Sequence, residues 1–438
     1  MSLPSTFPLL HDIRPDDISM SPFIVSTTRG FLPRGDPITK LPDAFSALEN
    51  LLQRMPIKKL DGEPGLLANG KFGDAVLADL PDLTDVILKH AYDMVLITAL
   101  YRDYSFLASA YLLEPCHERH VKGEEYGLAR DRLPKNIAVP LNTVSKIAGF
   151  KPWMEYAGSY ALYNYRLEDE KLGLEYDNTR LIRAFEHGLD PSSSEAGFVL
   201  VHVAMVRHSG ELVDGSLQVI QSCADGNRDN FNAGLAKVVS AMTKINKTMN
   251  LMWNKSKPGD YNSFRTFIFG IAKQSMFPNG VIYEGVSPEP QFFRGESGAN
   301  DSIIPLCDNL LEITMPNTPL TEILQDFRSY RPGNHREFLE WIHYRAQEVG
   351  TKTFALQDAN SAKWYLQALD QVRDFRWRHW TFTREYILKH SKHKTATGGS
   401  PIVTVSYSTC TSLLLGGKRN KHLLCTSAVT LELLGSEV

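Results

Sequence analysis

Two of the thirteen histidines stand in apolar surroundings, where an imidazole is either a core residue or a ligand to a metal. His379 shares a predicted helical face with Val372, Phe375, Phe382 and Tyr386, and His202 lies inside the almost wholly apolar run 198–206. A buried imidazole needs partners for its ring nitrogens, because its burial is otherwise costly. Each histidine is therefore a core residue bonded to a backbone carbonyl or part of a haem pocket, with one imidazole below the iron and one above. Composition does not choose between these interpretations.

Arg265 is a lone charge in the mostly aromatic segment 261–270. It is either an arginine at a helix start, with its stem on apolar groups and its head in water, or a guanidinium that binds a substrate carboxylate through two parallel hydrogen bonds. The glycine-rich stretches 294–299 and 397–400 match neither a phosphate-binding loop nor a dinucleotide fingerprint. Several other histidines, among them His117 and His335, stand among charged residues, and we expect them at the surface.

The elements that position these residues are predicted to be helices. Apolar residues recurring every three or four positions indicate helices over residues 43–54, 82–113, 194–207, 230–253 and 361–390. Pro134 and Pro140 predict a non-helical connector over 133–140, and strand-like alternation is confined to 402–407. We predict an all-α fold, with a smaller N-terminal helical domain over residues 1–187 packed on a larger C-terminal helical domain over 188–438.

The bulk composition excludes several classes of protein. A formal net charge of −3 over 438 residues gives no reason to expect a nucleic-acid or membrane partner. The five cysteines are scattered without CxxC spacing, which argues against a disulfide framework or a zinc site. No secretory signal and no membrane-spanning apolar run are evident, so we expect a cytoplasmic protein.

Seven segments, in the correct order, together resemble the indoleamine 2,3-dioxygenase family. They resemble its inter-helix connector and the helix after it, the distal-side helix, the substrate arginine with its following segment, the haem-edge loop with the next helix, the proximal-histidine helix and the mobile substrate loop. In this sequence they are residues 133–140, 153–165, 198–206, 265–285, 293–308, 375–387 and 397–400. The resemblance covers roughly residues 82–402.

The resemblance implies a fungal-type, tryptophan-cleaving dioxygenase with haem b as cofactor and O₂ as co-substrate. Both oxygen atoms would enter across the indole C2–C3 bond of L-tryptophan, giving N-formylkynurenine, the start of the kynurenine pathway towards NAD. We expect a monomer. Two alternatives remain: an enzyme of the same fold that oxidises a modified indole in secondary metabolism, and a non-catalytic protein that binds oxygen or haem.

Carried over residue by residue, the resemblance makes His379 the ligand to iron and gives catalytic roles to His202 and Arg265. The implied substrate-binding residues are Tyr156, Ser159, Phe198, Val199, Tyr261, Arg265, Thr397 and Gly398. The implied cofactor-binding residues are Gly295, Ser297, Gly298, Ala299, Asp308, Arg376 and His379.

Three positions depart from the family pattern. His202 stands where the mammalian enzymes have a serine, and its imidazole is a candidate partner for the indole N–H or for bound oxygen. Asp260 and Tyr261 stand where those enzymes have two phenylalanines, and a carboxylate beside Arg265 would reject or re-orient the substrate. Residues 403–438 alternate apolar and hydroxyl side chains in place of the family's polar terminal helix.

Overall fold

The computed structural model describes residues 4–188, 190–314, 319–391, 393 and 395–400, with backbone alone for 319–322. The predicted alternation over 402–407 and the segment 403–438 lie outside the described residues. Helices dominate the described chain, so the prediction of an all-α fold is confirmed.

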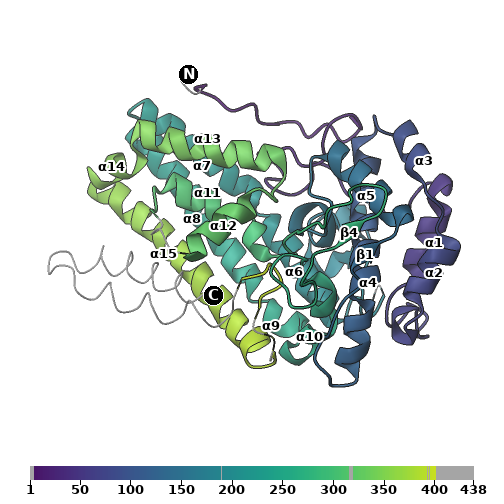
Figure 1. The fold of residues 1–438 in the computed structure, drawn as a ribbon. Coiled ribbons are helices and arrows are strands. Elements are labelled where there is room, and N and C mark those ends of the chain that lie inside the picture. The colour runs from purple at the N-terminus through teal and green to yellow at the C-terminus, as the bar shows by residue number, and fades with distance from the viewer. Residues whose placement is uncertain (1–3, 189, 315–318, 392, 394, 401–438) are drawn as a thin grey trace.

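Helices α1 to α5 form one side of the molecule, on the right in Figure 1. They are α1 (Ser46–Arg54), α2 (Phe72–Asp79), α3 (Thr84–Lys89), α4 (Met94–Val121) and α5 (Lys135–Ala148). Helix α4 is buried over nearly its whole length, because apolar residues surround its axis on all sides. It is therefore the central support of this side.

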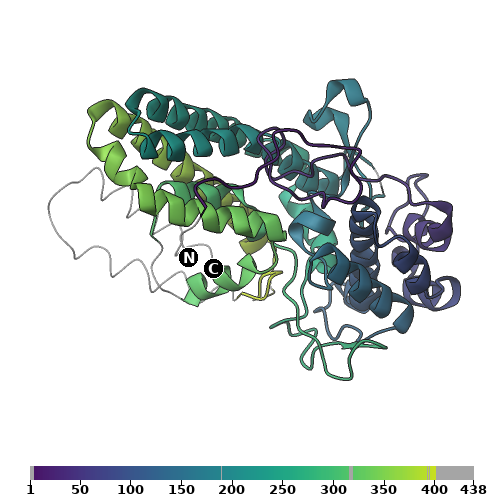
Figure 2. The same ribbon diagram turned by 90° about the horizontal axis from the view of Figure 1, so that it is seen from above.

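The helices from α6 onwards form the other side and the middle of the molecule (Figures 1 and 2). They are α6 (Ser194–Val206), α7 (Ser209–Ala224), α8 (Arg228–Met249), α9 (Met252–Lys255), α10 (Tyr261–Arg265), α11 (Ile303–Leu310), α12 (Pro319–Arg328), α13 (Gly333–Val349), α14 (Thr351–Leu356) and α15 (Ala359–Phe382). Helix α8 packs against α6, α7 and α15. It therefore joins the helix that carries His202 to the helix that carries His379.

Short 3-10 and π turns complete the helical content. The 3-10 turns are η1 (Asp43–Phe45), η2 (Leu67–Asn69), η4 (Glu170–Leu172), η5 (Tyr176–Asn178), η6 (Pro258–Asp260), η7 (Thr266–Ile268) and η8 (Gly298–Asn300). The π turns are η3 (Tyr156–Tyr160) and η9 (Thr383–Leu388). The latter continues α15, so the helix predicted to reach residue 390 changes its winding after Phe382.

The strands are few and short. β1 (Arg132–Leu133) pairs in parallel with β4 (Ile282–Tyr283), so that Arg132 lies opposite Ile282. β2 (Tyr165–Leu167) pairs antiparallel with β3 (Thr179–Leu181), with Tyr165 opposite Leu181. The β1–β4 pair joins residues on the two sides of the predicted domain boundary between residues 187 and 188. The division into two domains remains a prediction.

The N-terminal segment also crosses that boundary (Figure 2). The Val25 amide donates to Asn334 Oδ1 on α13 at 2.8 Å, and the Phe31 amide donates to Ser209 Oγ on α7 at 2.9 Å. Trp341 on α13 donates from its indole nitrogen to the Pro4 carbonyl at 2.9 Å. The first forty residues therefore tie the two sides together.

The predicted connector over 133–140 is wrong. Only Leu133 and Pro134 lie outside the helix, which starts at Lys135 and contains Pro140. A proline inside a helix removes one hydrogen bond and crowds the preceding turn. Burial of Ile137 and Leu141 together with Pro140 on the α4 side offsets this loss.

The stretch 153–165 also differs from expectation. The resemblance implies a helix there, but the structure has only the single π turn η3, followed by β2. The Glu155 side chain accepts hydrogen bonds from the amides of Ala157 and Gly158, which satisfies the start of this turn. Tertiary contacts with α4 replace the missing helical bonds.

The start of α6 agrees with the sequence. Ser193 caps the helix by accepting a hydrogen bond from the Ala196 amide at 3.1 Å. Two histidines that we expected at the surface, His117 and His335, are instead buried at 4% and 1% exposure. In the described part of the chain, no helix combines the length and the apolar character needed to cross a bilayer.

Candidate functional site

His379 lies near the end of α15, on the face that the sequence predicts. Its helical neighbours Val372, Phe382 and Tyr386 are buried and Phe375 is half-buried, whereas the imidazole itself is exposed. An imidazole beside an apolar surface is suited to ligate a metal. The position is therefore compatible with the predicted role.

The surroundings of His379 decide which kind of metal group would fit. Across the described ranges, no three His, Cys, Asp or Glu side chains gather to hold a metal ion. A metal on His379 would therefore have to bring most of its own ligands. Haem does so, since its porphyrin nitrogens hold the iron and the protein needs to supply one axial imidazole. The donor set fits haem b.

One turn before His379, Arg376 joins α15 to α11. Its Nη2 atom donates to Asp308 Oδ1 at 2.9 Å and to Oδ2 at 2.7 Å, and both side chains are largely excluded from solvent. Arg376 Nη1 is also buried and has no hydrogen-bond acceptor among the described atoms. The structure thus brings together two of the implied cofactor-binding residues, Asp308 and Arg376, one turn from His379.

His202 lies on α6 with its ring half-buried. Its Nδ1 atom is 2.9 Å from the Phe198 carbonyl oxygen, which only accepts, so Nδ1 carries the proton. Burial lowers the pKa of His202 to about 4, and the charge of His379 acts in the same direction. The ring is therefore neutral at pH 7, with Nε2 as an acceptor. The two imidazoles, on α6 and α15, are close enough to interact electrostatically.

Aromatic rings connect His202 to Arg265. The Phe198 ring centroid lies 5.1 Å from that of His202 and 5.3 Å from that of Tyr261, four residues before Arg265 on α10. The Tyr156 ring lies 5.7 Å from His202 on another side. Three predicted site residues, Tyr156, Phe198 and Tyr261, thus form one continuous aromatic group with His202.

Tyr156 also links this group to α11. Its hydroxyl donates to Asp301 Oδ2 at 3.2 Å, and Asp301 Oδ1 accepts from the Ile303 amide at the start of α11. Ser159, by contrast, uses its hydroxyl within η3, where it contacts the backbone of Glu155. Val199 is fully buried in α6.

Arg265 is fully buried, so it is not an arginine with its head in water. Its Nη1 donates to Ser391 Oγ at 2.8 Å and its Nη2 to the Thr395 carbonyl at 3.4 Å, while Nε has no acceptor. The guanidinium also lies over the Phe269 ring. No carboxylate of a described residue forms an ion pair with it.

Asp260 does not accompany Arg265 into the interior. Its side chain is exposed, and Oδ2 accepts a hydrogen bond from Ser194 Oγ at 2.8 Å at the start of α6. The carboxylate that we expected beside the substrate arginine is therefore bound to another helix.

The loops 294–299 and 395–399 meet beside this group. A Cβ on Gly295 would lie 2.3 Å from both the Gly270 nitrogen and the Thr397 carbonyl oxygen, so only glycine permits the contact. Thr397 Oγ1 donates to the Glu296 carbonyl at 2.9 Å, and Arg294 Nη1 donates to the Gly398 carbonyl at 3.0 Å. The two glycine-rich stretches are thus built as one unit.

The rest of the first loop runs past His202. A Cβ on Gly298 would lie 3.7 Å from His202 Nε2. Ser297 Oγ accepts from the Ala299 amide at 3.2 Å, and the Ala299 carbonyl accepts from Arg331. The loop therefore lies beside the Nε2 edge of the His202 ring.

Sequence reasoning passed over one residue in this loop. Glu296, between Gly295 and Ser297, is only 4% exposed, and burial raises the pKa of its carboxyl group to about 8. Its negative charge also raises the pKa values of Tyr156 and Tyr261, although burial is the main cause there. An acidic residue inside a glycine-rich loop was the signal available in the sequence.

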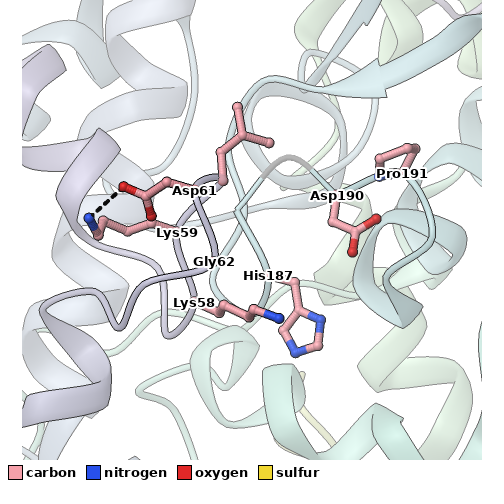
Figure 3. A pocket seen from close by; sticks show the side chains of 8 residues that line it. Lys58, Lys59, Asp61, Gly62, His187, Asp190 and Pro191 are labelled. Atoms are coloured by element: carbon pink, nitrogen blue, oxygen red, sulfur yellow. Dashed lines mark hydrogen bonds and ion pairs between the residues drawn. The ribbon is translucent and has the colours of Figure 1, made fainter.

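A separate surface pocket lies between residues 58–62 and the turn at 187–191 (Figure 3). Lys59 and Asp61 on its wall form an ion pair at 2.9 Å. None of the predicted site residues lines this pocket. Glu186, the residue before His187 of the pocket lining, accepts a hydrogen bond from Ser263 of α10. This is the indirect connection between the pocket and the candidate site.

Comparison with known proteins identifies the group to which this arrangement belongs. The model of the indoleamine 2,3-dioxygenase family matches residues 19–422. The chain belongs to the indoleamine 2,3-dioxygenase family. It is an oxidoreductase of the dioxygenase class, whose members act on indole compounds.

Relatives within the family differ in what their names describe. An indoleamine 2,3-dioxygenase of Aspergillus candidus is 28% identical over 348 residues, 74% of this chain and 77% of the relative. A 6-hydroxytryptophan 2,3-dioxygenase of Fusarium equiseti is 28% identical over 323 residues, 72% of each chain. A myoglobin of Haliotis diversicolor is 28% identical over 392 residues, 86% of this chain and 91% of the relative.

Proposed function

We propose that this member of the indoleamine 2,3-dioxygenase family uses haem b to add both atoms of O₂ across the indole C2–C3 bond of L-tryptophan. The product would be N-formylkynurenine, which enters the kynurenine pathway. The observation that carries the proposal is a fully buried Arg265 without a carboxylate partner, joined through Tyr261 and Phe198 to His202. We further propose a cytoplasmic monomer.

The proposed role of each residue follows from its chemistry. His379 would ligate the haem iron, and the Arg376–Asp308 pair would hold the helix that carries it. When bound, haem would supply the iron that activates O₂. Arg265 would bind the substrate carboxylate, because a guanidinium offers two parallel N–H donors.

The remaining site residues would shape the pocket. Tyr156, Phe198, Val199 and Tyr261 would surround the indole ring, with Ser159 behind Tyr156. Thr397 and Gly398 would close over the substrate, and the loop Gly295–Ala299 would lie at the cofactor edge. An enclosed apolar pocket excludes water and so protects reactive oxygen species from side reactions.

Haem ligation is tested by His379→Ala, with His390→Ala as a matched control. His390 is exposed and lies beyond η9, so its loss should leave the cofactor bound. We expect normal haem absorbance in the control and its loss in His379→Ala after reconstitution with haem. Full haem absorbance with unchanged activity in His379→Ala would overturn the assignment.

Substrate class is tested by Arg265→Lys, because lysine offers a point charge in place of the planar fork. Losing one charge-assisted hydrogen bond costs about 1.5–3 kcal/mol, or roughly a 10- to 150-fold loss of affinity for tryptophan. Tryptamine, which lacks the carboxylate, should be affected far less. An unchanged tryptophan-to-tryptamine ratio would show that Arg265 does not bind a carboxylate.

The names of two relatives each suggest an alternative function for this chain. The 6-hydroxytryptophan 2,3-dioxygenase of Fusarium equiseti supports a substituted indole as substrate, and the Haliotis myoglobin supports oxygen binding without turnover. A buried, carboxylate-free Arg265 favours the enzyme, since an oxygen carrier has no carboxylate to bind. A turnover screen of tryptophan, hydroxytryptophans and cyclised indoles separates the three functions.

A further inference from the structure

The candidate site contains two buried ionisable groups, one basic and one acidic, that do not pair with each other. Arg265 is fully buried, and Glu296 is 4% exposed. Within the described chain, no ion pair and no side-chain hydrogen bond reaches the Glu296 carboxylate, and no ion pair reaches Arg265. An ionised carboxylate without a partner is strongly disfavoured in a protein interior.

One cluster of buried charges elsewhere in the core is fully paired. Arg183 Nη2 donates to Glu49 Oε2 at 2.7 Å and to Asp103 Oδ2 at 2.8 Å, and Arg102 Nε donates to Asp103 Oδ1 at 2.7 Å. These residues are buried to a similar degree as Glu296. Arg265 and Glu296, by contrast, have no partner of opposite charge among the described residues, and Arg265 donates instead to Ser391 and the Thr395 carbonyl.

Both residues border the same aromatic group. Tyr261 lies one helical turn before Arg265 on α10, and its pKa is influenced by Arg265 and Glu296 in opposite directions, beneath the larger effect of burial. Glu296 also acts on Tyr156, whose ring lies beside His202. The Glu296 carboxyl group is therefore near enough to act electrostatically on the rings that would surround an indole.

The Glu296 backbone is held in place on both sides. Gly295 packs directly against the backbone of Gly270 and Thr397, and Thr397 Oγ1 donates to the Glu296 carbonyl. The acidic side chain therefore cannot leave the site without separating these loops. A rigid position is what a substrate-binding group requires.

We propose that Glu296 binds the ammonium group of the amino-acid substrate, while Arg265 binds its carboxylate. This assignment rests on the proposed function and names the residue that selects a zwitterion. A carboxyl group and a guanidinium group held apart in one pocket complement the ammonium and carboxylate groups of an α-amino acid. Neither tryptamine nor indole-3-propionate satisfies both groups.

The assignment also predicts a proton release. The raised pKa of about 8 keeps Glu296 protonated in the free protein at pH 7. On binding, the carboxyl proton passes to solvent and the carboxylate pairs with the ammonium group, which keeps its own protons. The other titratable groups that interact with Glu296 are Glu155, Tyr156, Tyr160 and Tyr261. The tyrosines have pKa values raised above 10 and do not titrate at pH 7.

The test compares haem-loaded wild type, Glu296→Gln and the exposed control Glu289→Gln. Affinities for L-tryptophan and indole-3-propionate are measured by calorimetry at pH 7. We expect Glu296→Gln to lose about 10- to 150-fold in tryptophan affinity, as for one charge-assisted hydrogen bond. Indole-3-propionate should bind wild type and Glu296→Gln alike, and Glu289→Gln should match wild type. An unchanged tryptophan-to-propionate ratio in Glu296→Gln would overturn the assignment.

The calorimetric titrations of wild type are then repeated in buffers of different ionisation enthalpy. The dependence of the binding enthalpy on the buffer gives the number of protons released, and this needs no variant. Tryptophan should release nearly one proton and indole-3-propionate none, whereas equal release for both compounds would overturn the assignment. In Glu296→Gln the release should vanish, and its persistence would assign the proton to Glu155. Failure of wild type to bind any of the indoles would instead overturn the proposed function, and this assignment with it.

Discussion

The two nitrogens of the His202 ring have different roles. Nδ1 donates to the Phe198 carbonyl, and the neutral ring therefore presents Nε2 as an acceptor towards the loop at Gly298. An acceptor can bind the N–H of an indole, but it cannot donate to bound oxygen. The structure thus favours one of the two partners that the sequence leaves open for this imidazole.

His202→Ser should therefore weaken the binding of indoles that carry a free ring N–H. Loss of one neutral hydrogen bond costs about 0.5–1.5 kcal/mol, or roughly 2- to 12-fold in affinity. 1-Methyl-L-tryptophan has no such N–H and should bind both proteins alike in a spectroscopic titration. A severalfold faster autoxidation with unchanged tryptophan affinity would instead show that His202 serves the bound oxygen.

At the scale of elements, α15 is held to α11 by the buried Arg376–Asp308 pair. The two residues come from helices separated by more than sixty positions in the chain. Because Arg376 precedes His379 by one turn, this contact fixes the orientation of the predicted ligand helix. The half-buried Arg373 on the same helix pairs, among the described residues, with Asp370 and Asp374 of its own helix.

Arg376→Met should destabilise the protein strongly, and Arg373→Met should not. Removing one partner of a buried ion pair costs about 3–5 kcal/mol, because the other charge is left buried. A half-exposed pair contributes about 0–1 kcal/mol. Urea denaturation measures both, and equal losses in the two variants would show that the α11–α15 pair has no special role. Haem affinity should fall only in Arg376→Met.

The whole molecule carries buried groups whose titration sets its stability against pH. Burial raises the pKa values of Glu155, Glu195 and Glu296 to about 8. Burial lowers those of His117 and His202 to about 4. Between about pH 4 and 6.5 the unfolded chain binds more protons at the histidines than the folded chain does, so their contribution to stability rises with pH.

Above pH 6.5 the histidines are neutral in both the folded and the unfolded chain and no longer change the stability with pH. The three buried acids then determine how the free energy of unfolding varies with pH. Each acid has a folded pKa above its unfolded value, so its stabilising contribution is complete below about pH 4.5 and is lost as the pH rises through 8. We expect the free energy of unfolding to fall by roughly 2 kcal/mol for each of the three acids between pH 6.5 and 8.5. Urea denaturation at both values, with Glu195→Gln expected to flatten the slope, checks this. A stability that rises over this interval would contradict it.

Local signals in the sequence were sufficient for the fold class and for most helices. The apolar periodicity of 194–207 and 230–253 produced α6 and α8 almost as predicted, because each helix buries a stripe or a whole surface against its neighbours. The ordered series of motifs, from His202 through Arg265 to His379, was enough to indicate the family. These features depend on residue type and spacing along a single element.

Contacts between distant segments decided the rest. Pro140 sits inside α5 because packing on α4 outweighs the missing hydrogen bond, and His335 is buried because α13 meets the N-terminal segment. Asp260 turns to Ser194, and Glu296 takes an inward position. Which carboxylate is bound and which is left unpaired depends on partners far away in the chain. Only the tertiary structure, which determines burial and partners together, could place an acidic group inside the site.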